Sequence, residues 1–522
     1  MDFLRPGLNI TINSGSIAKD GTITVAYTLT DPMGLPLDPA GIYTPGPITL
    51  GYIAAYIPAN QEQYTAYTTS SAKGTAGTFT VAGADSGGVV TALDSGKYQY
   101  VFKTKAPAGF DASATHTIGV YARRDMSAFN IPNNNASTVY SFVPDGSPVT
   151  HVRDIIKTPA CNSCHDQLSH HGGRRRQVEM CVLCHTPQSV DPNTGATVDF
   201  KVMIHKIHMG SQLPSVIAGT PYKVINTDFS TVVFPSDIRR CEKCHDQTSG
   251  ATQANYYFTK PTGAACGACH DNVNFATGLN HVGGPQKDDN LCSTCHFPQG
   301  ELEFDASIKG AHVIPTESAS LSGIQILLSG VQNNAAGQKP VVSFTVKDGQ
   351  GNALPLSKLD SISFTMAGPA SDYGYTSFGS DVTTPGYVTE SALAGSTCGT
   401  DGICTYSFAH AISSDAKGTY SIGVEARRTE TLLANTTKQQ TVRYSPKNQV
   451  INFSVDASPV VARRTVVDIN NCNSRCHTNL SMHGGPRNQT AYCVLCHNPS
   501  NTDAAMRPIA QVPADQAAPA QG

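Results

Sequence analysis

The sequence lacks several features that would point to a membrane or a nucleic acid. No run approaches the roughly 20 apolar residues that a spanning helix needs. The first residues, Met1–Pro6, have no apolar core or cleavage site of a secretory signal. We therefore expect the chain as written to be soluble and to lack a signal peptide. Lysine and arginine form no long run and the formal net charge is only -3, which argues against nucleic acid or an anionic membrane surface as main partner.

Cysteine, in contrast, is abundant, with sixteen residues in a chain of 522. Such a number is abnormal in a cytosolic protein unless the cysteines are ligands or attachment points. Fourteen of them fall into pairs that a histidine follows at once, six with the spacing Cys-x-x-Cys-His and a seventh with one extra residue. The six strict motifs are Cys161, Cys164 and His165; Cys181, Cys184 and His185; Cys241, Cys244 and His245; Cys266, Cys269 and His270; Cys292, Cys295 and His296; and Cys493, Cys496 and His497. The expanded motif is Cys472, Cys476 and His477.

This spacing has a chemical reason. Two thioethers can reach the two vinyl groups on one edge of a porphyrin, while the imidazole of the next residue reaches the iron. An extra residue can loop out without losing that reach. Structural zinc needs no histidine directly after the second cysteine and would leave an odd pair among seven, and simple disulfides do not explain the histidines either. We therefore predict seven covalently attached haem c groups.

Ten further histidines remain after the seven that follow the motifs. Such a surplus indicates iron held by two histidines, which is low-spin, closed to other ligands and suited to electron transfer. None of the nine methionines recurs at a fixed offset from the motifs. The ten are His116, His151, His170, His171, His205, His208, His281, His312, His410 and His483.

The two halves of the chain repeat each other. Ile118–Arg124 recurs as Ile422–Arg428, Asp145–Val149 as Asp456–Val460, and Cys181–His185 as Cys493–His497. Each copy has a front without motifs and a cysteine-rich back. The fronts alternate apolar and polar residues in short runs separated by Gly, Pro, Asn and Asp, which predicts antiparallel β-sandwiches or barrels. The backs show little periodicity and predict loops and short helices packed around the haems.

The fold class we expect is therefore multidomain, with two antiparallel β-sandwich or barrel domains alternating with two loop- and short-helix-rich multihaem cytochrome domains. The predicted boundaries are 1–147 for the first β-domain, 148–312 for a pentahaem domain, 313–458 for the second β-domain and 459–522 for the start of a second haem domain.

The repeat also selects candidate distal ligands. His171 and His483 each lie six residues after a motif histidine and each begins a His-Gly-Gly triplet. His170 aligns with Met482 and His151 with Ala462, so neither passes this test. His205 and His208 are three apart, so on a helix they share one face, and two such rings suit two adjacent haems better than one iron.

His281 and His312 complete five distal candidates for the five haems of the first cluster. For His312 the alternative is a linker histidine in solvent. His116 and His410 fall inside the predicted β-domains, where they are expected to be ordinary strand or loop residues.

The second cluster has two motifs but only His483 as a clear distal ligand. One interpretation of the end of the chain, Ala517–Gly522, is a natural Ala/Pro-rich tail. The interpretation we prefer is a shortened sequence, since the repeat offset places three further motifs near positions 553, 578 and 604 of a ten-haem parent. Loss of an N-terminal segment would equally explain the missing signal.

The order of β-domain, five haems, β-domain and further haems, with His-Gly-Gly after the first motif and His205-Lys206-Ile207-His208 after the second, resembles the OmcA/MtrC family of outer-membrane decahaem cytochromes. The resemblance covers essentially the whole chain. It departs from the family in having seven motifs, no signal sequence and no lipobox cysteine. It implies the ligand roles given above for the attaching cysteines, the proximal histidines, and His171, His205, His208, His281, His312 and His483.

By similarity, we expect haems displayed at the extracellular face of the outer membrane of a Gram-negative bacterium. They would receive electrons through a porin-cytochrome complex and pass them to Fe(III) or Mn(IV) oxides, soluble metals, flavins or other multihaem cytochromes. We expect mainly an electron-transfer protein, and whether it also acts as a dissimilatory metal reductase stays open. The alternative is a multihaem reductase acting on nitrite or sulfur oxyanions, which would need an iron with an open position. Polymerisation into a filament is neither favoured nor excluded.

Two cysteines, Cys398 and Cys404, lie outside the motifs in the second β-domain. In an oxidising compartment we expect a disulfide across this short gap. The resemblance to family members with a cysteine pair in that domain suggests a redox switch, and a plain structural cross-link is the alternative.

Overall fold

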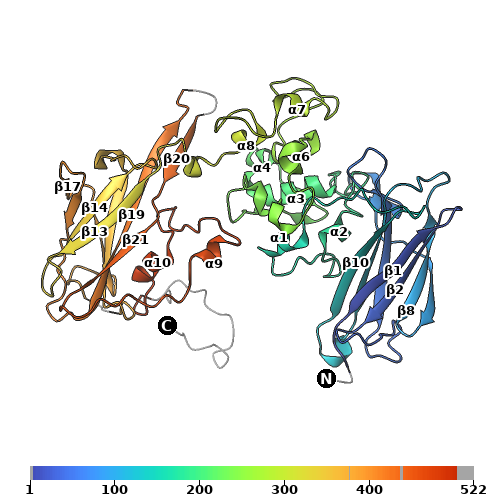
Figure 1. Cartoon of the computed structure of the whole chain (residues 1–522), viewed down its shortest axis with the longest axis horizontal. Helices are drawn as coiled ribbons and strands as arrows, with labels where there is room; N and C mark the ends of the chain where they lie inside the picture. The colour runs from blue at the N-terminus through green and yellow to red at the C-terminus, as the bar shows by residue number, and fades with distance from the viewer. Residues whose placement is uncertain (1–3, 375–376, 436–438, 502–522) are drawn as a thin grey trace. The chain divides into compact units, whose positions relative to one another are not determined.

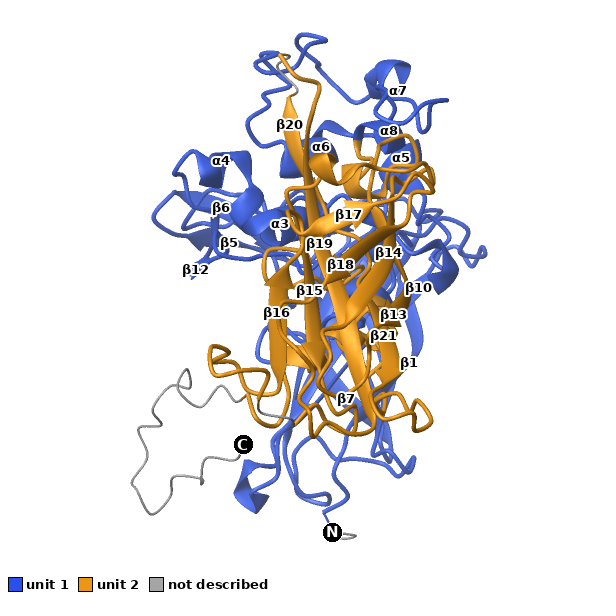
Figure 2. Ribbon diagram, turned by 90° about the vertical axis from the view of Figure 1, so that its left-hand side faces the viewer, with its two compact units in different colours: residues 1–311 blue, residues 312–522 orange. Residues whose placement is uncertain are grey.

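The computed structural model describes residues 4–374, 377–435 and 439–501, so the predicted tail at Ala517–Gly522 lies outside the described residues. The chain divides into two compact units, Met1–Ala311 and His312–Gly522, coloured separately in Figure 2. Each unit combines β-sheets with short helices, and strands dominate the regular structure (Figure 1). Over the described ranges, none of the helices has both the length and the apolar character required to span a membrane.

Unit 1 begins with two four-stranded sheets whose paired strands are antiparallel. Strand β2 shows why they form, because Ile23, Val25, Tyr27 and Leu29 alternate with polar residues and are fully buried. The first sheet has the order β1 (Asn9–Ile17), β2 (Thr22–Thr30), β8 (Lys97–Lys105), β7 (Val89–Asp94), and the second β10 (Asn134–Phe142), β9 (His116–Arg124), β3 (Ile48–Tyr56), β4 (Thr65–Ala66). Strands β5 (Thr69–Lys73) and β6 (Thr78–Ala82) pair separately.

The cysteine-rich part of unit 1 contains short helices joined by loops. Several end at a motif, because the two cysteines occupy one helical turn and the backbone then turns away at the histidine. The helices are α1 (Thr158–Asn162), α2 (Val178–Cys181), α3 (Phe200–Met209), α4 (Pro214–Ile217), α5 (Tyr256–Thr259), α6 (Gly263–Cys269), α7 (Cys292–Cys295) and α8 (Ile308–Ala311). A two-residue ladder joins β11 (Lys223–Val224) to β12 (Thr227–Asp228).

Unit 2 repeats this plan. One sheet has the order β13 (Gln325–Gln332), β14 (Val341–Lys347), β18 (Cys404–Ser407), β17 (Ser396–Cys398). The other has the order β16 (Tyr387–Ser391), β15 (Ser361–Ala367), β19 (Thr419–Leu432), β20 (Gln440–Tyr444), with β21 (Gln449–Ser454) also paired to β19. Helices α9 (Asn470–Asn473) and α10 (Thr490–Cys496) follow the strands.

The repeated heptapeptide occupies the same place in both units. In unit 1 it forms much of β9, which lies between β3 and β10. In unit 2 it forms part of β19, which lies between β15 and β21 at this point. Each strand therefore has neighbours on both sides, and a cysteine-rich segment packs against each of these sheets.

Candidate haem-binding sites

The backbone of every motif closes on its first cysteine. In the six strict motifs the histidine N–H donates to the carbonyl oxygen of the first cysteine, four residues earlier, at 2.8–3.0 Å. In the expanded motif the N–H of His477 donates to the carbonyl oxygen of Cys472, five residues earlier, at 3.2 Å. The extra residue before Cys476 is thus taken up within the turn, as the sequence led us to expect, and the histidine still closes on the first cysteine.

The motif sulfurs are not equally buried. Cys496 is buried and Cys164 is exposed, with its Sγ 3.7 Å from the Ser163 hydroxyl, whereas Cys476 is half-buried. All fourteen motif cysteines lie within the described ranges, and none of them is joined in a disulfide. The two sulfurs of each motif are therefore separate, as two thioether bonds require. The roles of Cys164 and Cys476 as attachment points, like those of the other twelve, remain predictions.

Five motif histidines face five of the other histidines. In each pair the ring centres stand 6.0–6.3 Å apart. Two imidazoles that ligate one metal ion from opposite sides stand about 6 Å apart between ring centres, because each nitrogen lies about 2 Å from the metal. The pairs are His165/His208, His171/His185, His205/His245, His281/His296 and His483/His497.

Hydrogen bonds fix which ring nitrogen is available in three of these pairs. Nδ1 of His185 donates to the carbonyl oxygen of Val198 at 3.0 Å, and Nδ1 of His208 donates to that of Ile204 at 2.9 Å. Nδ1 of His281 donates to the carbonyl oxygen of Gly284 at 2.7 Å. A carbonyl can only accept, so the neutral ring keeps its lone pair on Nε2. This is the usual second-shell arrangement of a metal-ligating histidine.

The surroundings also keep the rings neutral. Burial lowers the pKa of His205, His245 and His171 to about 4 in each case. Burial likewise lowers the pKa of His185 and His208. These rings are therefore unprotonated at neutral pH, as a metal ligand must be.

Helix α3 positions two of the distal candidates. Asp199 caps its first turn by accepting from the backbone N–H of Lys201 at 3.4 Å. His205 and His208 lie three residues apart on this helix but belong to different pairs, facing His245 and His165. Lys206, between them, forms a 2.6 Å ion pair with Asp271, which directly follows the fourth motif.

The two His-Gly-Gly triplets adopt the same unusual turn. His171 has φ 54° and His483 φ 56°, and both following glycines in each triplet also have positive φ. This left-handed region is uncommon for residues other than glycine. In both copies the residue before the histidine forms an isolated bridge with an arginine five residues on, His170 with Arg175 and Met482 with Arg487. The turn directs each ring toward the motif that follows it.

Each of these segments packs on a glycine of the central strand. A Cβ on Gly119 of β9 would lie 2.8 Å from Met180 Sδ and 3.0 Å from Leu183 Cδ1. A Cβ on Gly423 of β19 would lie 2.6 Å from both Leu495 and Tyr492. The missing side chains allow the second motif of each copy to approach the sheet closely.

An arginine also binds each central strand. Arg175 stacks its guanidinium 4.2 Å from the ring centre of Tyr121 and donates to the Tyr121 hydroxyl at 2.9 Å. At the equivalent place Arg487 forms a two-point ion pair with Glu425, at 2.6 and 3.3 Å. The sequence reasoning missed both contacts, although Tyr121 and Glu425 are the one position at which the repeated heptapeptides differ.

The cysteines of the first cluster lie near one another in a definite order. Burial, and then the neighbouring Cys181, raises the pKa of Cys161 to about 11. Burial raises the pKa of Cys244 to about 11 with a contribution from Cys161, and that of Cys269 to about 11 with a contribution from Cys241. Burial and then Cys292 raise the pKa of Cys266. These contributions connect the first motif with the second and the third, the third with the fourth, and the fourth with the fifth.

Several other predicted residues have plainer surroundings. His116 in β9 hydrogen-bonds the Tyr67 hydroxyl, and His151 bonds the backbone oxygen of Gln61. His410 lies between Glu390 and Asp381. The ligand roles of His270, His312 and His477, like those of the five facing pairs, remain predictions. In the described part of the chain, no three His, Cys, Asp or Glu side chains gather as a group that could hold a metal ion by themselves.

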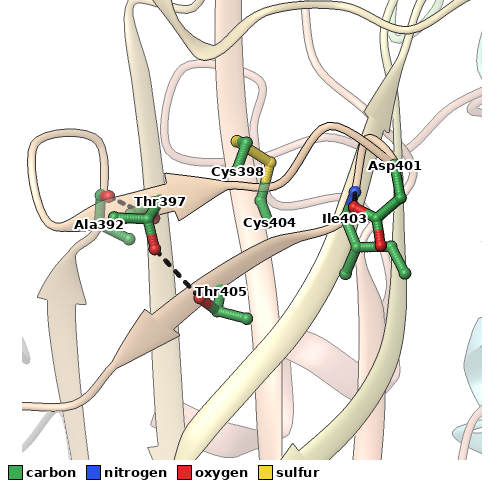
Figure 3. The surroundings of a disulfide bond; sticks show 8 residues. Ala392, Thr397, Cys398, Asp401, Ile403, Cys404 and Thr405 are labelled. Carbon is green, nitrogen blue, oxygen red and sulfur yellow. Dashed lines mark hydrogen bonds between the residues drawn. A yellow bond between two sulfur atoms is a disulfide. The ribbon is translucent and has the colours of Figure 1, made fainter.

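Cys398 and Cys404 are joined by a disulfide across β17 and β18 (Figure 3). Cys404 is buried in the core of unit 2, whereas Cys398 is exposed. The next cross-strand pair is linked by a hydrogen bond between the Thr397 and Thr405 hydroxyls at 3.2 Å. The disulfide thus closes the edge hairpin of the sheet.

Comparisons with known proteins point to one group. Residues 153–307 match a family model described as outer membrane cytochrome MtrC/MtrF-like, domains II/IV. The chain is 27% identical over 270 residues to the multiheme cytochrome MtrC of Shewanella baltica (strain OS185), a match that covers 50% of this chain and 36% of that protein. The match therefore spans about a third of the length of this curated relative.

Two solved structures have a similar fold. The crystal structure of the outer membrane decaheme cytochrome OmcA aligns with a TM-score of 0.70 and 19% identity, covering 94% of this chain and 78% of that one. The structure of MtrC from Shewanella baltica OS185 aligns with a TM-score of 0.59 and 21% identity, covering 95% and 81%.

Proposed function

We propose, from this chain's similarity to the OmcA/MtrC family, that it is a multihaem c-type cytochrome that transfers electrons at the outer-membrane surface. In this proposal each of the seven motifs attaches one haem c. The paired histidines would hold the haem iron, which would supply one-electron Fe(III)/Fe(II) chemistry there. The protein then serves as a relay rather than as an enzyme with one catalytic pocket.

The observation that best supports this proposal is the set of five histidine pairs at 6.0–6.3 Å. In the proposal, His165, His185, His245, His296 and His497 are proximal ligands, and His208, His171, His205, His281 and His483 are their distal partners. His270 and His312 are then the remaining motif histidine and the remaining distal candidate of the first cluster, and we assign them to each other.

The order of neighbouring cysteines supports a continuous path through the first cluster. The first motif neighbours both the second and the third, and the path continues through the fourth to the fifth. The second and fifth motifs would then be the two ends of this path, and electrons entering at one end would leave at the other. The proposed partners are a porin-cytochrome complex as donor, and metal oxides, soluble metals, flavins or other multihaem cytochromes as acceptors.

We further propose the domain division 1–147, 148–312, 313–458 and 459–522, in which β-domains alternate with haem domains. The two β-domains would then position the proposed haem-binding segments that pack on β9 and β19. Seven motifs in this chain give a pentahaem cluster and the first two haems of a second cluster.

The decisive experiment combines a haem count by mass with electron paramagnetic resonance of the oxidised, haem-loaded chain. We expect seven haems and low-spin signals for the five paired sites. In His171→Ala, one low-spin signal should be replaced by a high-spin one, because the distal ligand of a single iron is lost. His170→Ala is the matched control and should leave the spectrum unchanged, since the neighbouring His170 contributes its backbone to the bridge with Arg175.

A different result would contradict the relay. High-spin iron at the paired sites of the unaltered protein, or turnover of nitrite, would favour the reductase alternative.

For the disulfide, we propose a redox switch whose opening changes the rate of electron transfer to flavin or oxygen. Equal rates before and after selective reduction of Cys398–Cys404 would leave only a structural cross-link.

A further inference from the structure

The two segments that pack on the central strands are alike in almost every contact. Both use a His-Gly-Gly turn, a backbone bridge to an arginine that follows the turn, and a glycine on the strand. They differ in what the arginine meets on that strand. Arg175 meets the neutral Tyr121, and Arg487 meets the carboxylate of Glu425.

The two sites therefore differ in local charge. Among the described residues, the guanidinium of Arg175 takes part in no ion pair, and Arg174 lies beside it, 5.8 Å from the same tyrosine ring. Acids do lie near the site: Glu179 contributes at Cys181 and Asp199 at His185. Among the described residues, neither of these acids forms an ion pair with Arg175. A second arginine also lies at the second site, because Arg427 donates to the backbone oxygen of His483. Within the described ranges, however, only this one of the two sites pairs a carboxylate with an arginine: Glu425 contacts Arg487 through both carboxylate oxygens and offsets its charge.

Both arginines are close enough to act on the paired histidines. The charge of Arg175 contributes at His171, His185 and Cys184. The charge of Arg487 contributes at His483 and Cys496, and at both of these Glu425 contributes with the opposite sign. The side chains of Arg487 and Glu425 are 26% and 15% exposed, so solvent screens their charges only in part.

We propose that Tyr121 and Glu425 give two otherwise equivalent haem sites different reduction potentials, with the higher potential at His171/His185 and the lower at His483/His497. This inference rests on the proposed function. Each site takes up one electron, Fe(III) becoming Fe(II), with no bond made or broken, so its charge falls by one. An uncompensated positive charge favours the reduced state, and a carboxylate that cancels it removes that preference.

The consequence is a difference in driving force at two places that share one architecture. The site packed on β9 holds an electron more readily than the site packed on β19. Acceptors that need a stronger reductant would be served by the second site. None of the four side chains is proposed to ligate iron. Instead, Tyr121, Glu425 and the two arginines set the local charge beside the proposed histidine ligands.

The test is a redox titration of the full haem-loaded chain, with an electrode supplying the electrons and absorbance reporting the reduced fraction. The difference between the curves of a variant and of the parent isolates the haem that has shifted. Glu425→Gln, whose amide oxygen still accepts from Arg487, should shift one component to higher potential. Tyr121→Glu should shift one component to lower potential, and so should Arg175→Gln.

Glu430→Gln is the matched control. Glu430 lies on the same strand, pairs with Arg428 at 3.6 Å, and is five positions away, or about 16 Å along the strand. It should give a much smaller shift than Glu425→Gln. An unchanged or lower potential in Glu425→Gln, or an equal shift in the control, overturns the inference. If Tyr121→Glu fails to fold, Glu425→Gln alone decides.

Haem content and low-spin resonance are measured on every variant before the titration. A parent chain without seven covalently bound haems, or without low-spin signals for the five paired sites, contradicts the proposed function itself. A fully loaded chain whose potentials do not respond to Glu425→Gln contradicts only the present inference. The two failures are therefore distinguishable.

Discussion

The β-domains and the cysteine-rich segments are stabilised in opposite ways. Each pair of sheets encloses its own apolar core, around Val25 and Val120 in unit 1 and around Phe344 and Phe364 in unit 2. Between residues 241 and 311, all of which are described, the buried apolar side chains are only Ala251, Ala254 and Ala268. The strands can fold on their own side chains, whereas this segment lacks the apolar surface that a core requires.

The difference explains why the repeat alternates two kinds of sequence. A β-domain supplies a face with a glycine on its central strand, and the cysteine-rich segment carries the proposed haem ligands. Covalent haem would provide the missing apolar surface, and the nearby sheet would hold the first part of each segment in place. We therefore expect that the proposed haem-binding segments farther from a sheet depend more strongly on the cofactor for a stable fold.

The largest expected effect follows from withholding haem. In a chain expressed without the haem-attachment machinery, we expect residues 241–311 to lose protection from hydrogen exchange and proteolysis, because too few apolar groups are buried there. Strands β2 and β14 should keep their protection in the same sample. Protection of residues 241–311 without haem would contradict the comparison.

A smaller effect should distinguish the two packing sites. Gly423→Ala places a Cβ against Tyr492, which is fully buried and whose hydroxyl bonds Thr365 at 3.0 Å. Gly119→Ala meets Met180, a flexible side chain that can move aside. We expect Gly423→Ala to destabilise the packing of α10 by about 1–3 kcal/mol, and Gly119→Ala to cost less.

Hydrogen exchange in α2 and α10 measures these two effects separately. Gly83→Ala and Gly330→Ala are matched controls, because a Cβ at either position meets nothing within 4 Å and neither has positive φ. Both controls should be neutral or slightly stabilising. Equal losses of protection, in α2 for Gly119→Ala and in α10 for Gly423→Ala, would show that the identity of the packed side chain does not matter.

Much of the fold was predictable from the sequence, for physical reasons. Period-two alternation in residues such as Ile23, Val25 and Tyr27 predicted the strands, and the repeat predicted that two regions share one plan. The OmcA/MtrC resemblance is confirmed by the family model and the solved structures. The histidine pairs could be predicted only as a set of candidates, because sequence spacing does not show which ring faces which.

Two features were beyond prediction. Nothing in the spacing shows that His171 faces His185 rather than the nearer motif histidine His165, since this depends on the left-handed turn at His171. The different charge environments of Arg175 and Arg487 depend on which strand residue each one meets after folding. The repeat alignment shows that Tyr121 and Glu425 differ, but it does not show which side chain contacts each of them.

The smallest expected effect compares the two β-domains by pH. A hydrogen bond to Glu390, opposed by burial, and a second bond to Asp381 raise the pKa of His410 above its usual value. Its stabilising contribution is therefore complete below about pH 6.5 and is lost as the pH rises through the raised pKa. Burial lowers the pKa of His116, so its contribution is present above about pH 6.5 and is lost as the pH falls.

Hydrogen exchange of β16, which contains Glu390, and of β9, which contains His116, tests both signs in one protein. The ratio of exchange rates between His410→Gln and the parent, taken at each pH, cancels the intrinsic pH dependence of exchange. This ratio should fall toward one in β16 as the pH rises from about 6 to about 8, because the parent loses its protonated imidazole. For His116→Gln, the ratio in β9 should instead fall as the pH drops below about 6.5. If the two ratios changed with pH in the same direction, His410 and His116 would not distinguish the two sheets.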